Sequence, residues 1–401
     1  MIRFLTAGES HGKALTAIIE GFPSNLQITN EYINFHLARR QAGYGRGLRM
    51  KIETDKAEIL AGIRFQKTLG SPISMLIRNS DWENWIEKMS PESKKGKVEK
   101  ITIPRPGHAD LVGISKYNFD DIRNSIERSS ARETAARVAV GAIARRLLEE
   151  FGITIGSFVE SIGGIYPKKN YADELFNNQQ KVDGWGISEL ADKSQVRVLE
   201  SEQEEKIIRK IKLAKKRGDT LGGTFYTVAS GLSVGLGSFV HYDTKLDADI
   251  AHAFMSINAV KGVEIGTGFA CADAFGSASH DEIIYNKTIS RKTNRAGGIE
   301  GGVSTGLPII VKAAMKPIAT LMSPIASIDL ASFKAVDARR ERSDFVAVPA
   351  CAVIGESMLA WVLAKYFLQK FGGDSLEEIN DNYNSYCKKL EQRIRKNFKS
   401  T

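Results

Sequence analysis

The clearest helix in the chain is encoded by SARETAARVAVGAIARRLLEEFG, residues 130–152. A serine followed three residues later by a glutamate is the capping-box pattern of a helix N-terminus. The alanine-rich run behind it has high helix propensity, and a glycine such as Gly152 is a common residue just past a helix C-terminus. We therefore predict a helix that begins at Ser130 and ends at Phe151.

Segments on both sides of this helix alternate between strand-like and helical patterns. We predict strands at residues 2–6 and 15–19 and a helix at 30–40. An amphipathic helix over 201–217 should bury Ile207, Ile208, Ile211 and Leu213. Strands and turns should follow over 219–238, and a core helix over 350–371. Residues 41–49, 104–107 and 297–306 are rich in glycine or proline and predict loops.

The composition is that of a globular protein, with 401 residues, 42% hydrophobic and 26% charged. We find no internal repeat or low-complexity linker, and predict a single domain over residues 1–401. Its segment 160–200 is polar and irregular, which predicts a surface excursion. The lysine-rich tail after Tyr386 should be an exposed helix end.

Cysteine usage and hydropathy indicate a reducing, cytoplasmic environment. The three cysteines, Cys271, Cys351 and Cys387, are far apart and form no CxxC pair, which argues against a disulfide framework or a zinc site. The N-terminus lacks the long apolar stretch of a signal peptide. Charged residues and a proline interrupt the apolar run 346–368, which predicts a buried helix rather than a membrane span.

Two of the six histidines have glycine neighbours that allow close approach to a ligand. His11 lies in Gly8-Glu9-Ser10-His11-Gly12, and His108 follows Pro106-Gly107. Imidazole titrates near neutral pH and suits proton transfer. A structural role, with each histidine bonded to a turn carbonyl, is the alternative.

Arginines suggest what this site binds. The net charge is +9, and Arg39, Arg40, Arg46 and Arg49 fall close together. Arg105, Arg132 and Arg342 recur near the other motifs. Guanidinium groups suit phosphates and carboxylates, so we predict a pocket for a small polyanion. For Arg132 a surface ion pair with Glu127 or Glu133 is the alternative.

Two other functional classes compete with this interpretation. The pattern Gly8-x-Ser10-x-Gly12 fits the nucleophile elbow of serine hydrolases, although no upstream chain could supply the preceding strands. A nucleic-acid-binding protein would also use the positive charge. It would need a basic stripe with stacking aromatics, and Tyr44 is the only aromatic in the arginine loop. No Walker loop and no GxGxxG motif opening a βαβ unit are present.

Three long motifs together resemble the chorismate synthase family. The first runs from Gly8 to Gly12 and continues through Glu20-Gly21-Phe22-Pro23; the second is Glu127-Arg128-Ser129-Ser130-Ala131-Arg132-Glu133-Thr134. The third is Arg342-Ser343-Asp344 with the following helix. The segments 39–51 and 104–108 also look like the family. One departure is Phe345, where many members have proline.

The resemblance implies a lyase that converts 5-enolpyruvylshikimate 3-phosphate to chorismate by anti-1,4-elimination of phosphate. It implies reduced FMN as the cofactor, without net oxidation, and a link to NADP. His11 would protonate the reduced flavin and His108 would assist departure of the phosphate. Asp344 would set the protonation state of flavin N5, which accepts the proton lost from C6.

The resemblance also implies the binding residues and the architecture. Substrate would be held by Ser10, Arg40, Arg46, Arg49, Arg105, Arg132 and Arg342. The flavin would be lined by Ser130, Ala131, Arg132, Asn258, Ala259, Gly301, Lys316, Pro317, Ile318, Ala319, Thr320 and Arg342. The implied fold is an α+β, single-domain β-α-β sandwich with helices packed between sheets. Homotetramers are expected, with no metal, no nucleic-acid or membrane partner and no fused flavin reductase, so reduced flavin would come from outside the chain.

Overall fold

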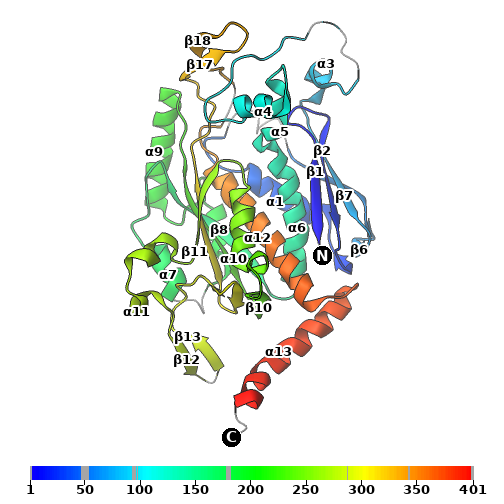
Figure 1. Ribbon diagram of the computed structural model, residues 1–401, viewed down its shortest axis with the longest axis vertical. Helices are drawn as coiled ribbons and strands as arrows, with labels where there is room; N and C mark the ends of the chain where they lie inside the picture. Colours follow the sequence, from blue (N-terminus) through cyan, green and yellow to red (C-terminus); the bar gives the residue numbers. More distant parts are fainter. Residues whose placement is uncertain are drawn as a thin grey trace.

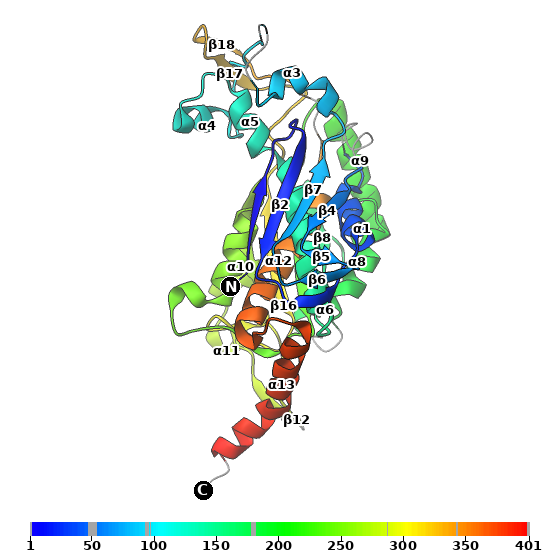
Figure 2. The ribbon, with the colours of Figure 1, turned by 90° about the vertical axis from the view of Figure 1, so that its right-hand side faces the viewer.

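Two four-stranded antiparallel sheets lie on either side of a layer of helices (Figures 1 and 2). The structure is a computed structural model that describes residues 2–46, 54–92, 96, 98–177, 182–286, 288–341 and 344–398. The first sheet has the order β1 (Arg3–Ala7), β2 (Ala14–Glu20), β7 (Ile73–Arg78), β4 (Ala57–Ala61). The second has the order β11 (Val260–Ile265), β16 (Ile309–Met315), β9 (Gly223–Ser230), β8 (Thr154–Ile162).

The helices between the sheets form the core. They are α1 (Asn30–Gln41), α6 (Thr134–Glu149) and α12 (Val348–Phe371). Helix α6 packs against α12 and the first sheet, whereas α12 also packs against β8 and β9. Small residues such as Gly141 permit this approach, because a Cβ there would lie 2.4 Å from Ser357 Cβ. The α+β fold class and the β-α-β sandwich are confirmed.

Helix α12 is long and apolar enough to cross a membrane, with a mean hydropathy of 1.5 over its most apolar window. It is nevertheless the central core helix, and side chains such as Leu359, Leu363 and Phe367 have no exposed surface. A helix that is apolar on all sides can be buried in a protein core. The predicted buried helix at 350–371 is therefore confirmed.

The helix predicted from Ser130 begins differently from the expected pattern. Ser130 accepts a hydrogen bond from the amide of Arg132 and caps a short 3₁₀ turn, η2 (Ala131–Glu133), before α6 starts at Thr134. The carboxylate of Glu133 pairs with Arg137, 2.9 Å away, instead of closing a reciprocal capping box with Ser130. At the other end, Gly152 has a φ of +72°, as expected for a residue past the helix end.

The segment 160–200, predicted to be an irregular surface excursion, is largely structured. It contains the end of β8 and two helices, α7 (Tyr171–Asn177) and α8 (Gly184–Asp192). Ala191 and Val196 are completely buried, and α8 packs on β8. The prediction was wrong because the segment buries polar side chains, including Ser188 and Arg197, which pair with one another and with α12.

Helix α9 (Ser201–Arg217) confirms the predicted amphipathic helix, with one correction to its buried face. Ile207 and Ile211 are buried, but Leu213 is 42% exposed and Ala214 takes its place. Strands β9 and β10 (Val234–Gly237) confirm the predicted strands at 219–238. The predicted loop 297–306 contains a tight hairpin of β14 (Ile299–Glu300) and β15 (Val303–Thr305).

Smaller elements gather at the two ends of the sandwich (Figure 1). One end carries η1 (Trp82–Asn84), α3 (Ile86–Met89), α4 (Asp110–Tyr117), α5 (Arg123–Ser129), β17 (Ala326–Asp329) and β18 (Lys334–Asp337). Towards the other end lie β3 (Ser24–Gln27), β5 (Ile63–Arg64), β6 (Lys67–Leu69), β12 (Ile283–Asn286), β13 (Thr288–Arg291) and α13 (Leu376–Phe398). Along the second sheet lie α10 (Leu246–Met255), η4 (Tyr242–Thr244), η5 (Gly268–Asp273) and α11 (Gly276–Ser279). The first end carries the candidate site.

Candidate active site

His11 lies in the turn between β1 and β2, where Glu127 of α5 holds it. Its Nδ1 lies 2.9 Å from Glu127 Oε2, and its backbone amide donates to the same oxygen at 2.8 Å. The imidazole stacks on Trp85, with ring centroids 3.9 Å apart and planes 24° apart. A carboxylate that binds Nδ1–H fixes the tautomer, so Nε2 becomes the nitrogen that can exchange a proton.

His108 lies at the start of α4 and is held in the same way by Asp110. Its Nδ1 is 2.5 Å from Asp110 Oδ1. Burial alone would raise the pKa of Asp110, but hydrogen bonds from His108 and Arg105 hold that pKa well below its usual range. The ionised carboxylate therefore accepts from Nδ1–H and leaves Nε2 as the proton-exchanging nitrogen.

Arg105, predicted to bind substrate, is occupied by protein groups. It donates from Nε and Nη2 to Asp110 and from Nη1 to Thr320 and Glu341, at 2.8–3.0 Å. Its Nη2 also lies 3.1 Å from His108 Nδ1. These contacts take up most of its donors, so the geometry favours a residue that positions His108 and Asp110 over one that grips a ligand.

Arg40 and Arg132 converge on one buried carboxylate, Asp55. Arg40 Nη1 lies 3.2 Å from Asp55, and Arg132 Nη1 pairs with its other oxygen. Arg132 Nε also donates to Asn79 at 2.9 Å. Arg132 is therefore neither a surface cation nor a partner of Glu127 or Glu133. Two guanidinium groups therefore converge on one buried carboxylate.

Further predicted residues adjoin this pair. Ser130 Oγ lies 3.2 Å from Ser10 Oγ, and Arg40 donates to the carbonyl of Ala131 at 3.1 Å. Arg46 pairs with Asp344 at 3.0 Å. Burial lowers the pKa of Arg40 to about 10; Asp55 opposes this effect, while nearby Arg46 and Arg132 add to it. Arg49 and Arg342, two further predicted ligands, lie outside the described residues.

Most of the predicted flavin-binding residues also lie together. Asn258 Nδ2 donates to the carbonyl of Ser129 at 3.1 Å, next to Ser130. The amide of Lys316 donates to Ala259 O at 2.9 Å, and Lys316 Nζ bonds the carbonyl of Gly107, beside His108. The hydroxyl of Thr320 accepts a hydrogen bond from Nη1 of Arg105. The segment 316–320, with Pro317, Ile318 and Ala319, therefore connects the His108 loop to Asn258.

Gly301 is the exception among these residues. It lies in the β14–β15 hairpin, and the carbonyl of the next residue, Gly302, accepts from Leu246 at the start of α10. Asn258 follows the other end of α10. Because a ten-residue helix is about 15 Å long, Gly301 lies away from Asn258, and within this chain the two are not brought together.

Several site residues were not predicted. Glu127 is 116 residues from His11, and Asp55 is 77 residues from Arg132, so no local pattern connects them. Asp110 follows His108 by two residues and could have been recognised as its partner. Arg39, grouped with the anion-binding arginines in the sequence, instead lies buried against Glu356 of α12.

The hydrolase alternative does not fit the geometry. A nucleophile elbow turns from a strand into a helix, whereas Ser10 lies between the antiparallel strands β1 and β2. Ser10 is also 2% exposed, and its amide donates to Glu127 O. Within the described ranges, no three His, Cys, Asp or Glu side chains group as a metal site would require.

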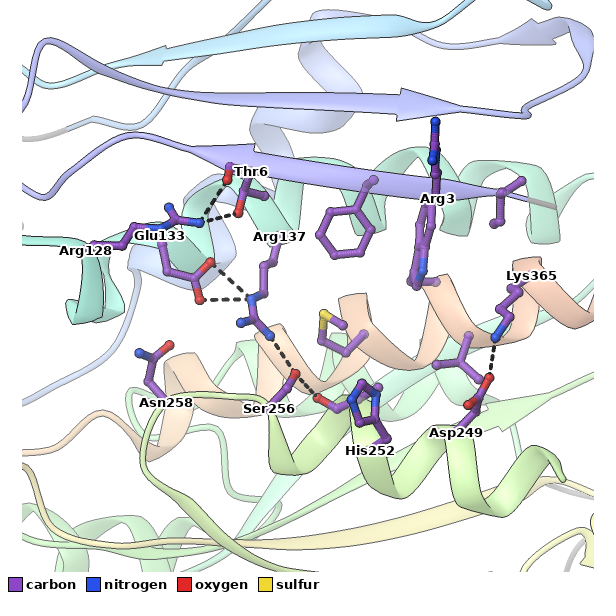
Figure 3. A pocket seen from close by; sticks show the side chains of 16 residues that line it. Arg3, Thr6, Arg128, Glu133, Arg137, Asp249, His252, Ser256, Asn258 and Lys365 are labelled. Carbon is purple, nitrogen blue, oxygen red and sulfur yellow. Dashed lines mark hydrogen bonds and ion pairs between the residues drawn. The ribbon is translucent and has the colours of Figure 1, made fainter. Parts of the chain in front are cut away.

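A cavity of about 670 Å³ adjoins the site between β1, α10 and α12 (Figure 3). It contains neither His11 nor His108 and shares only Asn258 with the predicted residues. Its cations already have partners: Arg137 pairs with Glu133, Lys365 with Asp249, and Arg128 bonds Thr6. The two candidate catalytic histidines therefore do not line this cavity.

Comparison with known proteins identifies a family. The family model described as chorismate synthase matches residues 2–368. A chorismate synthase of Chlorobaculum tepidum is 52% identical over 401 residues, which cover 99% of this chain and 100% of that protein. One of Aquifex aeolicus is 52% identical over 96% of this chain and 97% of its own length. A crystal structure of chorismate synthase is similar, with a TM-score of 0.79, 43% identity and 98% coverage of both chains.

Proposed function

The chain belongs to the chorismate synthase family, and from this premise we propose how its residues act. It is a lyase that converts 5-enolpyruvylshikimate 3-phosphate to chorismate and phosphate, the last step of the shikimate pathway. The observation that carries the proposal is that two carboxylate-held histidines and the Arg40–Asp55–Arg132 cluster occupy one end of the sandwich.

The arginines bind the substrate. Two carboxylates and a phosphate give it roughly three to four negative charges. Arg40 and Arg132, which converge on Asp55, supply two guanidinium groups suited to phosphate and carboxylate, with Ser10 nearby through Ser130. Arg46, next to Asp344, and also Arg49 and Arg342 complete the set. Arg105 acts through His108 and Asp110 instead of binding substrate directly.

The histidines move protons at their Nε2 atoms. Asp110 holds Nδ1–H of His108, so His108 donates from Nε2 to the departing phosphate and lowers the cost of its charge. Glu127 holds Nδ1 of His11, which leaves Nε2 as the atom that would protonate the reduced cofactor. Asp344, paired with Arg46, would set the protonation state of the cofactor nitrogen that accepts the substrate proton.

Reduced FMN fits the residues around Asn258. Asn258 Oδ1 is buried and, among the described residues, has no hydrogen-bond partner. Ala259 has a φ of +67°, an uncommon conformation for alanine that is typical of ligand-binding positions. Ser130, Ala131, Arg132 and residues 316–320 would hold the cofactor with them. When bound, reduced FMN supplies electron density that assists cleavage of the carbon–oxygen bond.

The remaining properties follow from the family and are also proposals. We propose a cytoplasmic homotetramer that takes reduced FMN from an external reductase, which links it to NADP. Exposed apolar side chains such as Phe239, Tyr242 and Phe275 support assembly. We expect no nucleic-acid or membrane partner.

Flavin binding tests the cofactor assignment directly. FMN and substrate added together to the protein should give a perturbed flavin absorption spectrum. Asn258→Ala should weaken FMN binding about tenfold or more, because it removes a buried hydrogen-bonding group. Asn384→Ala, on exposed α13, is the control. A spectrum that is identical with and without protein would contradict the assignment.

A further inference from the structure

The cavity between β1, α10 and α12 is lined partly by apolar and partly by charged side chains (Figure 3). All three elements contribute to the apolar lining: Phe4, Ala253, Met358, Trp361 and Val362. The charged lining has four cations and two carboxylates, besides His252: Arg3, Arg128, Arg137, Lys365, Glu133 and Asp249. Four against two leaves an excess of two positive charges. With about 670 Å³, the cavity is as large as those that take drug-sized ligands and can hold more than one large side chain.

Helix α10 turns one side towards this cavity. Asp249, His252, Ala253 and Ser256 line it, and residues three or four apart lie on the same side of an α-helix. Ser256 directly follows the last residue of α10. The cavity therefore follows the helix to beyond its C-terminal end.

A turn of exposed apolar side chains, residues 238–244, precedes the N-terminal end of α10. Three of its side chains are 74–82% exposed: Phe239, Val240 and Tyr242. The amide of Ser238 donates to the carbonyl of Thr244 at 3.0 Å, and the amide of Thr244 donates to the carbonyl of His241 at 3.2 Å. This exposed turn is therefore held by its own hydrogen bonds, which lowers the entropy that it would lose on binding.

The exposed turn and the cavity are related in a way that suits a second copy of this chain. The turn leads into α10 at Leu246, whereas the cavity extends past the other end of the helix. A two-fold axis that sets α10 antiparallel to α10 of a second copy reverses these ends. The turn of each copy then lies opposite the cavity of the other, and one self-complementary contact covers both features in both copies.

The charges of the two surfaces are also complementary. Asp243 lies in the exposed turn, pairs with His241 at 2.6 Å and has 61% of its side chain exposed. The cavity that would face it has the excess of positive charge. Opposite charges across an interface favour the correct partner and fix its register.

We propose that this cavity binds the exposed turn of a second copy of the chain. Phe239, Val240 and Tyr242 pack against the apolar lining, and Asp243 meets the positive charges. The proposal rests on the proposed homotetramer and assigns one of its two-fold contacts. A different protein would also fill the cavity, but it would leave the exposed turn of this chain in water.

Cysteine crosslinking of the full chain tests the contact. Phe239→Cys and His252→Cys are combined with Cys271→Ser and Cys387→Ser, which remove the exposed native thiols. A disulfide forms only where two Cα atoms come within about 7 Å, so oxidation should give a covalent dimer on a non-reducing gel. Phe65→Cys with His252→Cys, at a similarly exposed phenylalanine, is the matched control and should stay monomeric on the gel, as should each single variant. No dimer with the first pair, or equal amounts with both pairs, would overturn the proposal.

Light scattering separates this contact from assembly in general. Phe239→Asp combined with Val240→Asp should about halve the mass of the assembly, because a tetramer with three two-fold axes needs at least two different contacts. Phe65→Asp should leave the mass unchanged. A tetrameric mass for the double variant would overturn this contact and leave the homotetramer standing. A monomeric mass for the unmodified protein would overturn both, in favour of a small molecule or another protein in the cavity. Neither measurement needs flavin or turnover, so the catalytic roles are tested separately.

Discussion

His11 and His108 are held by the same device although they lie on different elements. Each has an acidic side chain at Nδ1, Glu127 at 2.9 Å and Asp110 at 2.5 Å. Such a carboxylate orients the imidazole and stabilises it when it carries a second proton. Proton exchange at Nε2 of both rings therefore follows from the two carboxylates.

Glu127→Gln should slow turnover about tenfold to a hundredfold. General acid–base catalysis contributes about 10²–10⁴, and an amide in place of the carboxylate removes part of it by weakening the hold on His11. Steady-state kinetics with saturating FMN measure this. Glu150→Gln, on the surface of α6, is the matched control. A rate equal to that of the unmodified protein would show that Glu127 only stabilises the backbone of the turn, by accepting from the amide of His11.

His108→Ala should slow turnover by about 10²–10⁴ with little change in substrate KM, because we propose that its Nε2 acts on the departing phosphate. His280→Ala, away from the site, should have no effect. If His108→Ala kept its full rate, His108 would have only a structural role.

Among single residues, the sequence identified the candidate histidines and arginines better than the carboxylates that hold them. Their glycine neighbours identified His11 and His108 as candidate site residues. Clustering in the sequence identified the arginines. Glu127 and Asp55 could not be found, because contacts between distant segments leave no local pattern. Lys316 and Asn258 emerged only from the family resemblance.

Glu356 of α12 connects several elements through a buried ionic cluster. Its carboxylate lies 2.7 Å from Arg39 of α1, 2.5 Å from Arg145 of α6 and 3.1 Å from Arg197. Ser157 and Ser188 also donate to it. Arg39 immediately precedes Arg40, so this cluster fixes the end of the helix that presents Arg40 to the site.

Glu356→Gln should lower the free energy of unfolding by about 3–5 kcal/mol, because it removes the carboxylate that three buried guanidinium groups share. Denaturant titration at pH 7 measures this loss, with Glu202→Gln on exposed α9 as the control. A loss below about 1 kcal/mol would mean that Asp192, which also pairs with Arg39 and Arg197, supplies enough counter-charge.

The difference in the free energy of unfolding between the unmodified protein and Glu356→Gln should depend on pH. Burial alone would raise the pKa of Glu356, but Arg39 and Arg145 hold that pKa well below its usual range. A depressed carboxyl pKa stabilises the folded state above the ordinary value, about 4.3, and this stability is lost as the pH falls. The difference between the two proteins should therefore shrink below about pH 4.

Amphipathic periodicity made α9 predictable and a long apolar run made α12 predictable, whereas buried polar residues caused the error at 160–200. Ser188 and Arg197 look like surface residues in the sequence, since their partner Glu356 is more than 150 residues away. The Ser130 pattern located the helix but not its 3₁₀ first turn, because Glu133 pairs with Arg137.

The arrangement of the whole molecule could not be derived from local patterns. Strands β2 and β7 pair although some 60 residues separate them in sequence (Figure 2), so the sandwich was expected only from the family resemblance. The exposure of the aromatic residues Phe239, Phe269 and Phe275 is likewise explained only if other subunits of an assembly cover them.

Light scattering after size-exclusion chromatography should give a mass of roughly four times 44.1 kDa. Three phenylalanines are 74–87% exposed, and apolar side chains that are exposed together mark subunit interfaces. Phe275→Glu should lower the measured mass, because a charged side chain at the subunit contact should weaken the assembly. A monomeric mass at micromolar concentration would contradict the proposed homotetramer.

We propose that the site forms chorismate with reduced FMN bound beside His11 and His108. An anaerobic assay of the full chain, with and without chemically reduced FMN, measures whether it does. Chorismate and equimolar phosphate should form only when reduced FMN is present, with no net consumption of reductant. Chorismate formation without any reduced flavin would contradict it.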